Sequence, residues 1–166
     1  MKRPLTISKT DVHKLACKLS RRLMPFAPEL VVYIEQGGKT VGLAIARELG
    51  VPALGLDISY PLSRKMNRAP QLIQGLLWPA KELVYRLSSP RLNSTFTGME
   101  KGKRVALVDD SASSGRSLKA ALSTLEHAGI DRSQIQVAVI RSGSRAHQFV
   151  DYFELSQPVL FVDRTA

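Results

Sequence analysis

Apolar side chains recur along the chain with two periods, one typical of helices and one typical of buried strands. Over residues 8–23 the apolar positions fall on one helical face. These positions are Val12, Leu15, Leu19 and Leu23. Ser8 stands where an N-cap belongs, Asp11 occupies the third helical position, and Pro25 cannot continue the helix. The pattern therefore predicts an amphipathic helix over residues 8–23.

Short β-branched runs bounded by turn residues predict buried strands. The first run, Leu30–Ile34, is followed by Gly37-Gly38. A helix is then predicted from Thr40 to Leu49, ended by Gly50, and a second strand over Pro52–Ile58. Strand, glycine turn, helix and strand in this order form a βαβ unit, which is right-handed by the general rule.

The same alternation returns after Lys103. The predicted elements are a strand over Arg104–Val108, a helix from Arg116 to Ala128, a strand over Ile135–Ile140, and shorter apolar segments at Phe149–Phe153 and Val159–Val162. Strands that alternate with helices predict an α/β fold with a mostly parallel, doubly wound sheet. The chain shows no internal repeat, so residues 1–166 are predicted to form a single domain.

Residues 59–100 interrupt this alternation. The stretch is rich in proline, serine and basic residues, and only Lys81–Leu87 has the pattern of a short helix or strand. A long insertion in a compact domain is usually a functional lid or a disordered loop. The residues alone leave both interpretations open.

Charge and length narrow the function classes. The chain has 166 residues, a net charge of +10 and a single cysteine, Cys17, so an internal disulfide is excluded. A basic surface attracts phosphates, nucleic acid or anionic membrane, although a merely solvated basic face explains the charge equally well. The apolar runs fall far short of the roughly 20 residues of a membrane helix, and no signal peptide is evident. We therefore expect no membrane partner and a cytoplasmic location.

The segment Val105–Ser117 carries the most chemical information. Four apolar residues of a predicted strand lead directly into Asp109 and Asp110. Ligands of open α/β sheets bind at the carboxyl ends of the strands, which is where these carboxylates are expected. They can accept hydrogen bonds from a diol and hold a hydrated Mg²⁺.

A loop of small residues follows the two acids and opens the next predicted helix. Its members are Ser111, Ala112, Ser113, Ser114, Gly115, Arg116 and Ser117. Backbone N–H groups at such a helix start form an anion site, and serine hydroxyls add donors. Acids and loop together predict a site for a sugar that carries both hydroxyls and a phosphate. An ordinary serine-capped helix entry without a ligand is the alternative.

Residues 105–117 resemble the phosphoribosyl pyrophosphate signature of the type I phosphoribosyltransferases. The resemblance implies that Asp109 and Asp110 bind the ribose 2- and 3-hydroxyls and that the loop 111–117 binds the 5-phosphate. It further implies Mg²⁺-dependent transfer of a 5-phosphoribosyl group from phosphoribosyl pyrophosphate to a nitrogenous base. Some purine-using relatives carry an aspartate where Ser113 stands, and a serine cannot replace it as a base at neutral pH.

The same resemblance assigns the turn after the first core strand to the leaving pyrophosphate. Gln36, Gly37, Gly38 and Lys39 would form this pyrophosphate loop, because glycine amides can face a diphosphate and a lysine adds charge. Family members often carry a basic residue just before the glycines. This chain has Glu35-Gln36 there instead.

Three further assignments follow from the resemblance. The insertion at about 59–100 corresponds to a flexible catalytic lid, with Arg64, Lys65 and Arg68 as candidates to close over the pyrophosphate. The segment at about 143–166 corresponds to a small hood. Arg141 and Phe161 are candidates for the base site, although a strand-end arginine and a packed aromatic ring are equally ordinary features.

The family often forms homodimers, so a homodimer is expected here. The alternative function is a ligand-sensing regulatory or nucleic-acid-binding protein of the same fold without transferase activity, which the +10 charge would suit.

Overall fold

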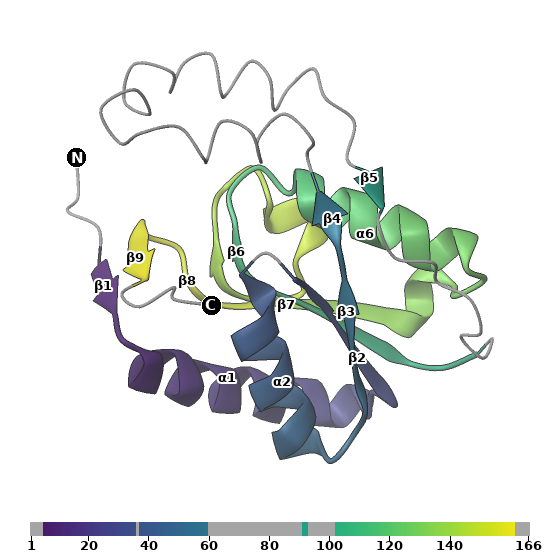
Figure 1. The fold of residues 1–166 in the computed structure, drawn as a ribbon, viewed down its shortest axis with the longest axis horizontal. Helices are drawn as coiled ribbons and strands as arrows, with labels where there is room; N and C mark the ends of the chain where they lie inside the picture. The colour runs from purple at the N-terminus through teal and green to yellow at the C-terminus, as the bar shows by residue number, and fades with distance from the viewer. Residues whose placement is uncertain (1–4, 36, 60–90, 93–101, 162–166) are drawn as a thin grey trace.

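The computed structural model describes residues 5–35, 37–59, 91–92 and 102–161 (Figure 1). Its centre is a sheet of five strands in the order β3–β2–β6–β7–β8. These strands are β2 (Leu30–Ile34), β3 (Ala53–Leu56), β6 (Val105–Ala112), β7 (Ile135–Ser142) and β8 (Tyr152–Leu155). Every neighbouring pair is parallel, so the predicted parallel α/β sheet is confirmed.

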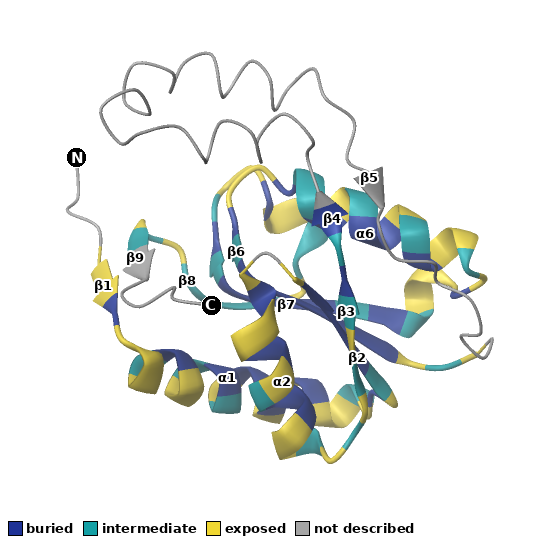
Figure 2. Ribbon diagram, viewed as in Figure 1, coloured by how far each residue is buried: buried dark blue, intermediate teal, exposed yellow. Residues whose placement is uncertain are grey.

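Helices cover both faces of this sheet, as the doubly wound prediction requires. Helix α1 (Lys9–Leu23) and helix α2 (Gly38–Leu49) pack together on one face, and α6 (Arg116–His127) covers the other (Figure 1). The central strands are buried on both sides, as Figure 2 shows. Burial on both faces explains why the strands appear in the sequence as continuous apolar runs.

Helix α1 begins as its sequence predicts. The Ser8 hydroxyl accepts a hydrogen bond from the backbone N–H of Asp11 at 3.2 Å. The Asp11 carboxylate in turn accepts from the Ser8 backbone N–H at 3.1 Å, which completes a capping box. After Leu23 the chain turns through the 3₁₀ helix η1 (Met24–Phe26), because Pro25 ends the regular helix.

The largest departure from the predicted elements is the length of β6. This strand runs through Asp109 and Asp110 to Ala112, whereas the apolar pattern ends at Val108. Pairing with the equally long β7 continues to Ser111↔Arg141 and Ala112↔Ser142. Apolar patterning predicts a strand only as far as its residues are apolar, so the continuation of both strands through polar residues, some of them buried, was not predicted.

Smaller departures lie at element ends. Helix α2 begins at Gly38, two residues earlier than predicted, and the predicted strand over Pro52–Ile58 divides into β3 and β4 (Ile58–Ser59). The apolar segment predicted at Phe149–Phe153 instead begins at the last residue of the 3₁₀ helix η3 (His147–Phe149) and ends within β8. Another 3₁₀ helix, η2 (Arg132–Gln134), leads into β7.

Two small sheets flank the central one. Strand β1 (Leu5–Ile7) pairs in parallel with β9 (Val159–Phe161), and β4 pairs antiparallel with β5 (Arg91–Leu92). The predicted hood therefore divides, because β8 belongs to the central sheet while β9 joins β1. The proposed lid residues Arg64, Lys65 and Arg68 lie outside the described residues. Among the described helices, none combines the length and apolar character that crossing a bilayer requires.

Candidate functional site

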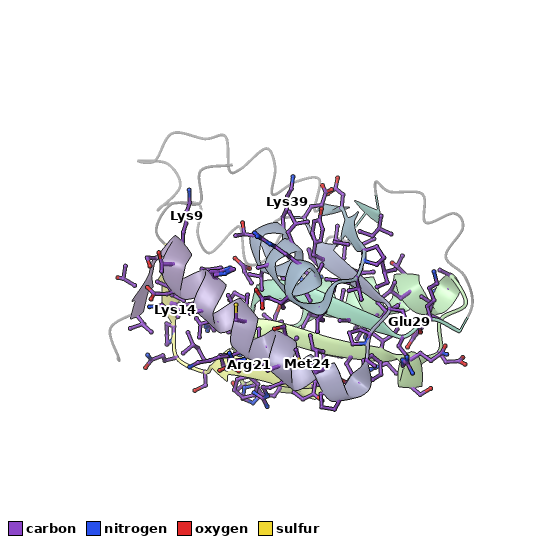
Figure 3. All side chains as sticks on the ribbon, turned by 90° about the horizontal axis from the view of Figure 1, so that it is seen from below. Lys9, Lys14, Arg21, Met24, Glu29 and Lys39 are labelled. Atoms are coloured by element: carbon purple, nitrogen blue, oxygen red, sulfur yellow. The ribbon has the colours of Figure 1, made fainter. Side chains whose placement is uncertain are left out.

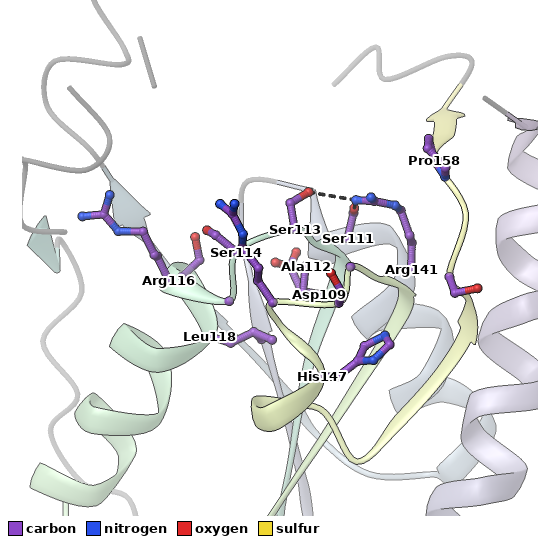
Figure 4. A pocket seen from close by; sticks show the side chains of 16 residues that line it. Asp109, Ser111, Ala112, Ser113, Ser114, Arg116, Leu118, Arg141, His147 and Pro158 are labelled. Atoms are coloured by element: carbon purple, nitrogen blue, oxygen red, sulfur yellow. Dashed lines mark hydrogen bonds between the residues drawn. The ribbon is translucent and has the colours of Figure 1, made fainter. Parts of the chain in front are cut away.

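A cavity of about 940 Å³ opens at the carboxyl edge of the sheet, between the loop that joins β6 to α6 and the turn that joins β7 to η3 (Figure 4). Its volume is within the range of small-molecule sites. The lining residues are Asp109, Ser111–Leu118, Arg141, Gly143, Ser144, Arg145, His147, Ser156 and Pro158. The whole predicted phosphate loop thus lines one cavity.

Gly115 determines how the phosphate loop enters α6. It is the N-cap residue and has φ of 74°, a left-handed conformation that a side chain disfavours. A Cβ atom at this position would lie 2.5 Å from Cδ2 of Phe149, so the ring of η3 packs directly on the glycine backbone. None of the described side chains caps α6, and the first N–H groups of a helix have no partner within the helix. The helix start is therefore suited to an anion.

The turn after β7 holds this loop in place. Gly143 donates its backbone N–H to the carbonyl of Ala112 at 2.7 Å, and Ala146 donates to the carbonyl of Gly143 at 2.8 Å. A Cβ atom on Gly143 would lie 2.9 Å from the carbonyl oxygen of Ser113. The two turns consequently approach backbone to backbone, which only a glycine permits.

Arg141 connects the strand β7 to the serine loop. Its Nη1 donates to the Ser113 hydroxyl at 2.8 Å and to the Ser111 hydroxyl at 3.3 Å (Figure 4). Its Nε donates to the carbonyl of Gln157 at 3.2 Å. Arg141 is a predicted base-site candidate, and the structure brings its guanidinium against the hydroxyls of the phosphate loop. The other candidate, Phe161, lies in β9, and its side chain is outside the described part.

Asp109 and Asp110 lie within β6 and are almost fully buried, with 5% and 7% of their surface exposed. The backbone N–H of Asp110 donates to Oδ1 of Asp109 at 2.8 Å. Asp109 lines the cavity, whereas Asp110 is not among the lining residues. Successive side chains of a strand point to opposite faces, so Asp109 faces the cavity while Asp110 lies against Gly37.

The double-glycine turn lies directly beside these acids. A Cβ atom on Gly37 would come within 2.6 Å of Oδ1 of Asp110, and one on Gly38 within 3.2 Å of Oδ1 of Asp109. Gly37 has φ of 121°, and it precedes α2 as its N-cap. Because neither glycine has a Cβ atom, the two carboxylates can approach the turn closely. The structure therefore brings the predicted pyrophosphate turn and the predicted ribose-binding acids together.

Two charged residues, Glu35 and Lys39, flank this turn in the sequence. Lys39, labelled in Figure 3, is exposed in the first turn of α2. Glu35 is exposed as well, and its carboxylate lies over Gly55 of β3, where a Cβ atom would be 2.7 Å from Oε1. Gln36, the remaining member of the predicted pyrophosphate loop, lies outside the described residues.

Sequence reasoning missed part of the cavity wall. Gly143, Ser144, Arg145 and His147 line it from the turn after β7. The imidazole of His147 stacks on the ring of Phe153, with ring centroids 4.8 Å apart. The stretch Arg141–Arg145 is a run of serine, glycine and arginine after a buried strand, and this resemblance to the loop after β6 was an available signal.

Comparison with known proteins decides the family. The model of the phosphoribosyl transferase domain matches residues 5–158, which is nearly the whole chain. The chain belongs to the phosphoribosyl transferase domain family. Among curated proteins, amidophosphoribosyltransferases of Mycobacterium bovis and Mycobacterium tuberculosis are 28% identical over 142 residues. This match covers 80% of the chain but 24% of the relatives, so the chain spans about a quarter of their length.

Solved structures, among them phosphoribosyltransferases, share the fold. The purine phosphoribosyltransferase of Pyrococcus horikoshii has a TM-score of 0.72 at 17% identity, covering 96% of this chain and 91% of that one. The xanthine-guanine-hypoxanthine phosphoribosyltransferase of Helicobacter pylori has a TM-score of 0.67 at 15% identity, covering 98% and 91%. A hypothetical protein of Neisseria gonorrhoeae with bound ppGpp has a TM-score of 0.67 at 14% identity, covering 97% and 89%. At these identities the likeness is one of fold.

Proposed function

We propose that the protein transfers the 5-phosphoribosyl group of phosphoribosyl pyrophosphate to a nitrogenous base in a Mg²⁺-dependent reaction. One observation carries the proposal. The serine loop and the two buried acids, which together form residues 109–117, meet the double-glycine turn, a segment distant in sequence, at one edge of the sheet. Phosphoribosyl pyrophosphate has three matching parts, which are a 5-phosphate, a diol and a diphosphate.

The 5-phosphate is assigned to the loop 111–117. Its serine hydroxyls, the uncapped start of α6 and the guanidinium of Arg141 are all donors, and donors of this kind bind phosphate oxygens. Arg141 is already aligned by two hydroxyls and a carbonyl, so little conformational entropy would be lost when the phosphate binds. Arg116 and Arg145 add two further positive charges to the cavity wall.

The ribose and the diphosphate are assigned to the neighbouring acids and glycines. Asp109 and Asp110 would accept hydrogen bonds from the ribose hydroxyls, and Gly37 to Lys39 would take the pyrophosphate. Carboxylate oxygens are the donors that Mg²⁺ prefers, and Asp109 supplies them at the cavity wall, so the residues fit this ion. The bound ion would neutralise negative charge on the diphosphate oxygens.

In the proposed reaction the bond from the anomeric carbon to the pyrophosphate oxygen breaks, a bond to a base nitrogen forms, and that nitrogen loses its proton. The chain contributes mainly by positioning the sugar and stabilising the charge of the leaving group. Ser113 is occupied as a partner of Arg141, and a hydroxyl does not serve as a base at neutral pH. The proton is therefore assigned to solvent or to the departing pyrophosphate.

A purine or a related heterocycle is the proposed acceptor. The support is the fold shared with purine phosphoribosyltransferases. Ammonia belongs in the same acceptor panel, because the curated relatives are named amidophosphoribosyltransferases.

We also propose that the protein forms a homodimer in the cytoplasm. The exposed leucines Leu43 and Leu54 offer apolar surface for such a contact. Light scattering of the purified protein tests the dimer.

The decisive experiment measures pyrophosphate release from phosphoribosyl pyrophosphate with Mg²⁺ and a panel of bases. Wild-type protein is expected to release pyrophosphate with at least one acceptor, and the double variant Asp109→Asn/Asp110→Asn is expected to release none. Asp131→Asn, an exposed acid that precedes η2, is the matched control and should behave as wild type. Tight binding of phosphoribosyl pyrophosphate without turnover on any acceptor would instead favour the ligand-sensing alternative.

A further inference from the structure

A second cluster of chemically active side chains lies away from the cavity, where α1 packs against α2. It consists of His13 and Cys17 on α1 and Glu48 near the end of α2. One ligand atom from each residue lies within 4.8 Å of the others. Sγ of Cys17 and Nε2 of His13 are 3.9 Å apart.

Helix geometry explains why these residues converge. His13 and Cys17 are four positions apart, so they occupy one face of α1, one turn above the other. The two helices pack against each other, with Ala16 and Ile45 in the same buried cluster (Figure 1). Glu48, in the last turn of α2, lies near Cys17. The three side chains therefore come from two elements that the hydrophobic core fixes relative to each other.

We propose that His13, Cys17 and Glu48 form a binding site for a borderline-soft divalent cation, with Zn²⁺ as its probe. Thiolate, imidazole and carboxylate are the three donor types that Zn²⁺ takes, and two donors at i and i+4 of one helix are a recurrent arrangement. Mg²⁺ and Ca²⁺ prefer all-oxygen sites, which disfavours them here. Water completes the coordination, since His13 and Glu48 are exposed.

The distances suit this assignment after a small side-chain movement. Zinc bonds of about 2.0–2.3 Å imply donor atoms roughly 3.5 Å apart in a tetrahedral site. The sulfur and imidazole nitrogen are already near that separation at 3.9 Å. His13 and Glu48 are exposed and can rotate, whereas Cys17 is half-buried and serves as the fixed donor.

The metal-free state of the site is also defined. Burial raises the pKa of the Cys17 thiol above its ordinary value, and the nearby Glu48 carboxylate raises it further. The positive charge of Arg21 acts in the opposite direction. Binding of a cation to the Cys17 thiolate would release the thiol proton. A raised pKa makes a thiol a poorer nucleophile, which argues against an oxidation sensor at this position.

The site is separate from the phosphoribosyl site. Helix α2 has 12 residues, and Gly38 at its start and Glu48 near its end are about 15 Å apart along the axis. The cation would bind both helices at the end of α2 remote from the double-glycine turn. Its presence does not depend on the proposed transferase activity, and substitutions there should leave basal activity unchanged.

The test uses metal-free purified protein titrated with Zn²⁺ by calorimetry and with Co²⁺ by absorption spectroscopy. One ion per chain is expected, with a thiolate-to-cobalt charge-transfer band that Zn²⁺ abolishes. Cys17→Ser should remove the band, and His13→Asn or Glu48→Gln should each weaken Zn²⁺ binding by at least about tenfold. His127→Asn, on the exposed face of α6, is the matched control and should leave both signals intact.

Two outcomes would overturn the proposal. One is Zn²⁺ binding of unchanged affinity in Cys17→Ser and His13→Asn variants whose circular dichroism matches wild type. The other is Zn²⁺ binding that disappears in Asp109→Asn/Asp110→Asn and persists in all three cluster variants, which would locate the ion at the phosphoribosyl site. Failure of transferase activity with an intact cobalt band would reject the proposed function and leave the cation site standing.

Discussion

Two strand-to-helix turns lie side by side at the carboxyl edge of the sheet, and they use glycine for different ends. The turn before α6 places Gly115 under the ring of Phe149, while the turn before α2 places Gly37 against the carboxylate of Asp110. Both glycines have positive φ, and neither helix has a cap from a described side chain. In the first turn the missing Cβ leaves room for the ring of Phe149, which supports the loop. In the second it leaves room for the carboxylate of Asp110.

The difference extends to the donors around each turn. The turn before α6 has serine hydroxyls and the guanidinium of Arg141, whereas the turn before α2 has Lys39 in its helix and two carboxylates beside it. The first turn has, by itself, the donors that the proposed phosphate site requires. The second becomes suited to a diphosphate when a cation offsets the carboxylates, which matches the proposed role of Mg²⁺.

The largest effect is expected from a substitution that disturbs the packing of Phe149 on the turn before α6. Gly115→Ala should destabilise the protein by about 3 kcal/mol, because a left-handed alanine is strained and its Cβ overlaps Phe149. Gly50→Ala is the control, since Gly50 has φ of 68° and no atom within 4 Å of its Cβ position, and about 1 kcal/mol is expected there. Urea denaturation measures both, and equal losses would show that Phe149 is irrelevant.

The next largest effect is expected on ligand binding, from a substitution in the turn before α2. Gly37→Ala should weaken binding of Mg²⁺ and phosphoribosyl pyrophosphate by about 100-fold, because the new Cβ displaces the Asp110 carboxylate from the site. Calorimetry with the wild-type protein as reference measures the change. Gly50→Ala should bind phosphoribosyl pyrophosphate as the wild type does. Unchanged affinity in Gly37→Ala would show that this turn does not contact the substrate.

A smaller effect tests whether Arg141 belongs to the phosphate loop. Arg141→Gln should raise the KM for phosphoribosyl pyrophosphate about tenfold, as expected for a lost charge-assisted hydrogen bond. If the residue reads the base instead, the KM for the base rises and that for phosphoribosyl pyrophosphate stays constant. Arg104→Gln, whose Nε donates to the carbonyl of Ala27, provides the control.

The smallest expected effect concerns the start of α1, which, unlike α2 and α6, is capped by a side chain, that of Ser8. Ser8→Ala should cost about 1 kcal/mol of stability and leave catalysis unchanged. Hydrogen bonds from Ser8 hold the pKa of Asp11 below its ordinary value. The resulting stability is therefore complete above that ordinary value and is lost as pH falls through the folded-state pKa. Denaturation in acid should show a shallower pH dependence for Asp11→Asn than for wild type.

The sequence by itself determined the parallel α/β fold, the capping box of α1 and the position of the serine loop before α6. Each of these depends on near neighbours along the chain, so spacing and residue type are sufficient to predict it. The 3.6-residue period marks the buried face of α1, and the serine and glycine residues after Val108 define the loop before α6.

Tertiary structure alone decided which turns meet. The polar extension of β6 and β7, the contact of Arg141 with Ser113, the approach of Asp110 to Gly37 and the convergence of Cys17 with Glu48 join residues far apart in sequence. Apolar periodicity specifies that a segment is buried, and it does not specify the strand order or the residues at the rim. Those follow from the packing of the whole sheet, where missing Cβ atoms and paired strand ends set the distances.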